Sequence, residues 1–282
     1  MKKNTIKLPT ASLESLVNDV RQYNVISNEG IGDLFNSLID NSKSLFTRVF
    51  NFNSEKAYND AVEDKFQVIR FMQGFTNVDL SEIVIVVPDR FTGSLPLLID
   101  DLGYAYNSFM DDLIIALGVI DLDISDSINN AGEGKLFTAP RSIVNMRNLK
   151  KKRTVLHDKL SKNFTLTKTK THSKMINHFR STKEVIGIYP KLQQVEAVFS
   201  KVPMTKLWNE SAGISEKVGI LIEKIESLGP TVRADLSLKE TTEAIYELGK
   251  CLEFVGYMQA TLLQVYGSVN SIGKNVINYH NL

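Results

Sequence analysis

Apolar residues recur every three or four positions along the C-terminal part of the chain, and this pattern restricts the fold more than any other. The stripe runs from Glu240 to Val276 and continues for about ten helical turns. Such spacing is typical of a long amphipathic helix and does not fit a strand. The apolar side of that helix must be covered by other helices, from this chain or from a copy of it. The residues of the stripe are Ile245, Leu248, Leu252, Val255, Met258, Leu262, Val265, Val269, Ile272 and Val276.

Helical periodicity also occurs earlier in the chain, and it predicts a mainly α, multi-helix fold with minor β structure and long C-terminal helices. Runs of β-branched residues favour short strands in three places. An acidic stretch rich in Asn and Gly, residues 121–134, favours a loop. Helices are predicted over residues 33–50, 55–74, 95–120, 191–199, 212–228 and 238–276. Strands are predicted near residues 83–87, 165–171 and 185–189.

Charge is sorted along the chain, although the formal net charge is only +1. Residues 51–135 contain fifteen acidic and five basic residues, whereas residues 141–183 contain thirteen Lys or Arg and one acid, Asp158. Segregation of this size indicates a surface that holds an oppositely charged partner. We therefore divide the chain after the leader (residues 1–29) into an acidic helical region (30–140), a basic insertion or hairpin (141–183) and a C-terminal helical region (184–282).

The basic segment is the strongest candidate for binding, and three interpretations of it are open. Its cations could contact DNA phosphates without reading sequence, dock onto an acidic protein surface, or lie solvated. Residues 51–135 are an available acidic partner, in this chain or in a neighbouring copy. The alternating Thr and Lys of residues 165–171 favour an extended conformation, as a hairpin or as a loop that orders on binding. The candidate contact residues are Lys150, Lys151, Lys152, Arg153, Lys159, Lys162, Lys168, Lys170 and Lys174.

The residue types of catalytic and metal sites are scarce or badly spaced. The one cysteine, Cys251, excludes an intramolecular disulfide and a Cys-based zinc site, and its apolar neighbours predict that it is buried. The four histidines fit no common metal spacing, and no phosphate-binding glycine loop or nucleophile elbow occurs. We therefore predict a non-enzymatic protein without a cofactor or metal. The acidic pairs Asp100-Asp101 and Asp111-Asp112 leave one alternative, a carboxylate-dependent nuclease.

The longest strongly apolar stretch, residues 113–120, has eight residues, whereas a helix that crosses a bilayer needs about 20. No membrane span is predicted.

A short joint near the N-terminus resembles a proteolytic processing site. Ile26-Ser27-Asn28-Glu29, followed by Gly30, is similar to the sites at which prohead proteases of T4-like and phiKZ-like tailed phages cut after Glu. Ser27 supplies the small residue two positions before the Glu, and Ile26 supplies the aliphatic residue three positions before it. A polar leader, this joint and an amphipathic helix together resemble the internal head proteins of large phages. The resemblance covers residues 10–50 only.

The resemblance implies a packaged virion protein whose leader, residues 1–29, directs it into the prohead and is then removed by the prohead protease. It implies assembly in the host cytoplasm, a final location in the head interior, and capsid or other virion proteins and DNA as partners. The mature chain has 29 Lys or Arg and 29 Asp or Glu, which fits a localised contact better than bulk DNA condensation. The alternative in a different class is a tail, neck or baseplate component, held in a homo-oligomer by the C-terminal helices.

Overall fold

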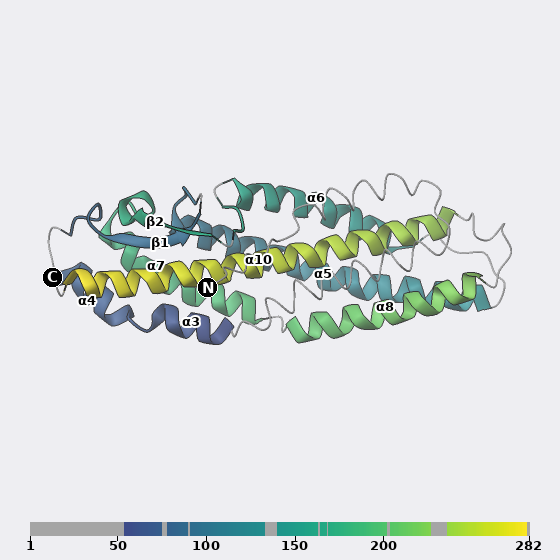
Figure 1. Cartoon of the computed structure of the whole chain (residues 1–282). Helices are drawn as coiled ribbons and strands as arrows, with labels where there is room; N and C mark the ends of the chain where they lie inside the picture. The colour runs from purple at the N-terminus through teal and green to yellow at the C-terminus, as the bar shows by residue number, and fades with distance from the viewer. Residues whose placement is uncertain are drawn as a thin grey trace, which may run out of the picture.

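The computed structural model describes residues 54–74, 78–89, 91–132, 140–162, 164–167, 169–201, 204–226 and 236–280, and the fold there is mainly α with a small β element. The helices lie side by side along one direction and form an elongated bundle (Figure 1). Several predictions fall outside the described residues: the leader, the helix over residues 33–50, Lys168, and the cleavage residues Ile26, Ser27, Glu29 and Gly30.

Two long helices, α5 (Leu95–Gly132) and α10 (Leu236–His280), form the axis of the bundle. The 45 residues of α10 span about 68 Å and run almost the whole length of the molecule (Figure 1). This confirms the long helix that the C-terminal stripe predicted. The cover for its apolar side comes from the same chain, since α5, α6, β1, α3 and α4 all contact it. The shorter helices are α3 (Ser54–Val62), α4 (Lys65–Gly74), α6 (Ser142–Ser161), α7 (Thr182–Ser200) and α8 (Met204–Glu226).

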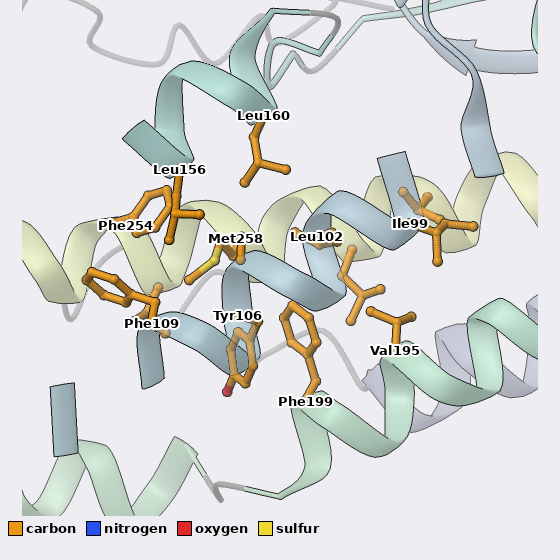
Figure 2. Close-up of a cluster of buried hydrophobic side chains, with 14 of the residues drawn as sticks. Ile99, Leu102, Tyr106, Phe109, Leu156, Leu160, Val195, Phe199, Phe254 and Met258 are labelled. Atoms are coloured by element: carbon orange, nitrogen blue, oxygen red, sulfur yellow. The ribbon is translucent and has the colours of Figure 1, made fainter. Parts of the chain in front are cut away.

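The core runs along the contact between α5 and α10. Figure 2 shows the middle of it, where side chains from α5, α6, α7 and α10 meet. Tyr106 of α5 stacks on Phe199 of α7, with ring centroids 3.7 Å apart, and Phe109 makes an edge contact with Phe254 of α10 at 5.1 Å. Burial of such side chains stabilises the fold by about 1.5–3 kcal/mol for each residue. The residues labelled in Figure 2 are Ile99, Leu102, Tyr106, Phe109, Leu156, Leu160, Val195, Phe199, Phe254 and Met258.

A two-stranded antiparallel sheet packs against α10 near the C-terminal end of that helix (Figure 1). β1 (Val84–Pro88) confirms the strand predicted near residues 83–87. β2 (Lys170–Lys174) overlaps the strand predicted over residues 165–171 only at its last two positions. The register pairs Val86 with His172. The amide of Val86 points away from β2 and donates to the Ser271 hydroxyl of α10 at 2.6 Å, which attaches the sheet to the bundle.

Two sequence predictions are wrong because helices continue through segments that looked like loop or strand. Residues 121–132 are the last three turns of α5, where a loop was predicted. Residues 185–189 belong to α7, where a strand was predicted, and Pro190 lies inside the same helix. In α7 the apolar run is the buried side of a helix, because Val185, Ile188 and Tyr189 all face the core.

The basic segment also differs from the expected hairpin, because residues 142–161 form helix α6. A hairpin is therefore wrong for this half of the segment. The ion pairs that join Arg141 to Asp123 and Lys159 to Asp101 show that α6 runs antiparallel to α5.

Candidate functional site

The basic helix α6 lies against both α5 and α10, so its cations are close to the acids of these two helices. Its buried side carries Ile143, Met146, Leu149, Leu156 and Leu160, which recur at the spacing of one helix face. Basic residues lie on either side of that apolar strip. One flank therefore points toward α10 and the other toward α5, and each neighbour supplies acids.

On the α10 side, a buried carboxylate joins two of the predicted contact residues. Glu247 has a side chain only 3% exposed, and it accepts from Lys150 Nζ at 2.7 Å and from Arg153 Nη2 at 3.1 Å. Arg153 is also mostly covered, at 17% exposed. A carboxylate taken out of water this completely needs such partners, since an unpaired buried charge costs several kcal/mol. The Glu247 bridge is thus a structural link between α6 and α10.

On the α5 side, two more of the predicted contact residues bind acids of the acidic region. Lys152 Nζ lies 2.6 Å from Asp112 Oδ2 and also donates to the backbone oxygen of Ser108 at 2.7 Å. Lys159 Nζ lies 2.7 Å from Asp101 Oδ1. The acidic and basic segments that the sequence separates are therefore joined within one chain.

The start of α6 is fixed by a carboxylate that comes from α5. Asp123 is 6% exposed, and its Oδ2 accepts from the backbone amide of Ser142 at 2.7 Å. The same carboxylate pairs with Arg141 at 3.3 Å. The first amides of a helix have no partner within the helix, so Asp123 acts as a cap supplied by a neighbouring helix.

The other described candidate contact residues are exposed, and one of them, Lys170, also lines a pocket beside α10. Within the described part of the chain, no ion pair involves Lys151, Lys162, Lys170 or Lys174, and all four are exposed. Lys151 and Lys162 lie on the outer side of α6 or just after it, whereas Lys170 and Lys174 lie on β2. The nine candidate residues thus separate into a paired set, an exposed set and Lys168, which is not described.

The acidic pairs on α5 take part in ion pairs with lysines of other helices. Asp100 pairs with Lys191 of α7, and Asp121 accepts from Lys217 of α8 at 2.7 and 2.8 Å. Among the described residues, no group of three or more His, Cys, Asp or Glu is arranged to hold a metal ion. Asp111 is the member of the pairs that has no ion pair within the described residues, and it is exposed.

A pocket of about 560 Å³ lies between α3, β1 and α10. Ala57, Val86, Leu263 and Tyr266 give it a largely apolar lining. Gln264 also lines it and donates its amide to the Thr167 backbone oxygen at 2.6 Å, while its Oε1 is buried and unbonded among the described residues. A pocket with this lining can accept an apolar group, and Lys56, Asp60 and Lys170 add charged groups to its edge.

The two most deeply buried reactive side chains are held in structural positions. Cys251 is buried as predicted, and burial raises the pKa of its thiol to about 12. His178 is 2% exposed, stacks on Phe91, and places its ring nitrogens 3.0 Å from the Gly93 oxygen and 2.9 Å from the Ser173 hydroxyl. Burial lowers the pKa of His178, so its ring stays neutral in the fold.

Sequence reasoning missed Glu247, Lys191 and Lys217, which take part in four of the seven ion pairs described above. Glu247 leaves a trace in the sequence, since it stands next to Leu248 inside the apolar stripe of α10. No sequence pattern indicates Lys191 or Lys217, because each is far from its acidic partner in the sequence and only the fold brings the two together.

No described helix has both the length and the apolar character needed to cross a membrane. No protein-family model, curated protein or solved structure shows significant similarity to this chain.

Proposed function

We propose that this chain is a non-enzymatic structural protein of a phage particle, packaged in the head interior and matured by cleavage after Glu29. The observation that carries the proposal is the use of its sorted charges. Carboxylates of α5 and α10 are bonded to lysines and arginines of α6, α7 and α8, so the groups that could do chemistry hold an elongated bundle together. Such a bundle is suited to contact with other proteins.

The position of the bundle in the chain is compatible with removal of a leader. The first described helix begins at Ser54, well after Gly30. Every described residue therefore remains in the chain after a cut at Glu29, and the core of the bundle keeps all of its members.

A DNA contact would have to use the exposed cations. Lys150, Lys152, Arg153 and Lys159 are compensated within the chain, which leaves four of the described candidate residues for phosphates. Each phosphate contact changes the slope of log affinity against log salt by about 0.9. We therefore propose a weak, localised DNA contact, with a slope no steeper than about −4 from these four residues.

The N-terminal peptide of the protein in purified particles tests the proposal. Mass spectrometry should find a peptide that begins at Gly30, and a Glu29→Gln chain should keep its leader. Because residues 30–282 include the whole described bundle, the cleaved and full-length chains should unfold at similar temperatures. Particles that contain only the chain beginning at Met1 or Lys2 would overturn processing after Glu29.

A second candidate function is an oligomeric component of the tail, neck or baseplate. It is favoured by large apolar side chains that are exposed along α5 and α6, among them Ile115 at 62% and Val155 at 68%. A full-length chain present in particles at a fixed ratio to tail proteins would favour this candidate. The same peptide analysis therefore separates the two.

A further inference from the structure

A line of exposed apolar side chains follows the outer side of α5. Leu97, Tyr104, Ile115 and Leu122 are 54, 61, 62 and 54% exposed, respectively. Their spacings of 7, 11 and 7 residues are close to two, three and two whole turns, so all four lie on one side of the helix. This side faces away from the buried residues Leu102, Phe109 and Leu113.

The spacing of this line is symmetric about its midpoint, near residues 109 and 110. When a second α5 is laid antiparallel on the first about that midpoint, Leu97 meets Leu122 of the copy and Tyr104 meets Ile115 of the copy. All four side chains of each copy then have an apolar counterpart. A two-fold interface requires this reciprocal pairing of two different positions.

Helix α6 widens the same face. Lys152 of α6 is bonded to Asp112 and to Ser108, so α6 lies directly beside the middle of α5. Val144 and Val155 of α6 are 60 and 68% exposed. They lie eleven residues apart on the outer side of α6, next to the α5 line.

Two unpaired charges of opposite sign stand at the middle of this face. Asp111 and Lys151 are exposed, and neither has an ion pair within the described residues. They lie one position before Asp112 and Lys152, which are bonded to each other, so both are close to the midpoint. Two copies placed face to face bring each of these groups nearest to its own counterpart, so the apolar side chains, and not these charges, favour the second copy.

The size of the face fits a stable complex. The α5 line is about 38 Å long, and two adjacent helices are about 20 Å wide. That gives about 760 Å² for each copy, or about 1,500 Å² in total, within the range of specific protein interfaces.

We infer that the α5–α6 face binds the same face of a second copy of this chain, with the two α5 helices antiparallel. The partner is a second copy because the apolar spacing is complementary to itself and the area of the face is that of a specific interface. The inference does not depend on the proposed location in the phage head, and its test uses the purified full-length chain.

Sedimentation velocity from micromolar concentrations upward tests the dimer. The expected mass is twice that of the 31.7 kDa chain. Ile115→Asp should weaken the dimer at least about a hundredfold, because each interface would bury two uncompensated carboxylates. Gly118→Glu should act similarly, since a side chain at this exposed position meets nothing within 4 Å in the single chain and should not disturb its fold.

The matched control is Phe66→Asp, which makes the same kind of change at an apolar residue that is 80% exposed on α4, outside this face. It should leave the dimer intact. Circular dichroism should show the same helicity for all three variants. A monomeric wild-type chain at high micromolar concentration, or a dimer insensitive to Ile115→Asp, would overturn the inference.

Cysteine cross-linking tests the antiparallel register. A short bismaleimide should join Leu97→Cys chains to Leu122→Cys chains in a mixture, and should join neither variant to itself. The native Cys251 does not compete because it is fully buried. Efficient cross-linking of Leu97→Cys alone would indicate parallel helices and contradict the proposed pairing.

Discussion

The two sides of helix α6 carry similar residue types but have different surroundings. On the inner side, Lys150 and Arg153 share the buried Glu247, and Lys152 is bonded to Asp112. On the outer side, Lys151 has no partner among the described residues. In the sequence, residues 150–153 form one basic run. The helix rotates successive residues by about 100°, so it divides that run between a neutralised side and a free side.

The comparison shows that a basic run should be judged by where its side chains point. Six of the thirteen cations in residues 141–183 serve as links to acids on α5 and α10: Arg141, Arg147, Lys150, Lys152, Arg153 and Lys159. The charge available to an outside partner is therefore much smaller than the sequence indicates. Stability should depend on the inner side and association on the outer side.

The largest effect on stability is expected at Glu247, the buried carboxylate on the inner side of α6. Glu247→Gln should lower the free energy of unfolding by about 2–3 kcal/mol, because Arg153 and Lys150 lose their buried counter-charge. Glu243→Gln is the matched control, since Glu243 is 42% exposed and pairs with a half-exposed Arg147. That control should cost no more than about 0.5 kcal/mol in urea denaturation. Equal effects of the two changes would remove the distinction between buried and exposed pairs.

The next effect concerns the cap that α5 supplies to α6. Asp123→Ala should cost about 1–2 kcal/mol, because the buried amide of Ser142 loses its acceptor. Asp126→Ala removes a carboxylate that is 53% exposed and contacts only the other end of Arg141, so it should change stability by less than about 0.5 kcal/mol. Both values follow from thermal or chemical unfolding. An Asp123→Ala variant with unchanged stability would show that this cap does not stabilise α6.

A smaller effect should distinguish the lysines of α6 that stabilise the fold from those that are exposed to a partner. Replacing Lys152 and Lys159 with Met should lower the free energy of unfolding by about 1 kcal/mol and leave the salt slope of DNA binding unchanged. Replacing Lys151 and Lys162 with Met should leave stability within about 0.5 kcal/mol and make the slope shallower by up to about 2. Fluorescence anisotropy with a short duplex at several salt concentrations measures the slope. A shallower salt slope after the Lys152 and Lys159 changes, or a loss of stability after the Lys151 and Lys162 changes, would contradict the comparison.

The smallest effect concerns His178, a buried histidine next to the sheet. Burial lowers the pKa of His178 below its usual 6.5, so the unfolded chain binds more protons than the fold at and just below that pH. Its contribution to stability is therefore present above pH 6.5 and is lost progressively as the pH falls below about 6.5. His178→Gln should flatten this part of the pH profile of the free energy of unfolding. Identical profiles for wild type and His178→Gln would exclude this role.

The helices of the axis could be predicted because their signals are long and regular. The stripe of α10 contains ten apolar residues at helical spacing, and no other regular structure explains them. The end of α5 could not be predicted in this way. Asp121, Asp123 and Asp126 read as an acidic loop, but in the fold each is bonded to Lys217 or Arg141. Lys217 and Arg141, which are distant from these acids in the sequence, supply the positive charges that allow the acids to lie on a packed helix.

The start of α7 was missed although its signal is local. Ser181 and Glu184 have the spacing of a capping box, and in the fold the Ser181 hydroxyl accepts from the Glu184 amide at 3.4 Å. Pro190 led to a strand prediction, yet the packing of Val185, Ile188 and Tyr189 keeps the helix intact around it. The candidate contact residues were chosen by charge alone, which carries no information about which of them Glu247 neutralises.

A double-mutant cycle between Glu247 and Arg153 tests most directly whether the charges of α6 hold the bundle together. Glu247→Gln, Arg153→Met and the double variant are compared with wild type by urea denaturation. We expect a coupling energy of about 1.5–3 kcal/mol, because both side chains are buried and directly bonded. A coupling near zero, with the two single changes simply adding, would contradict the role of these charges as links between helices.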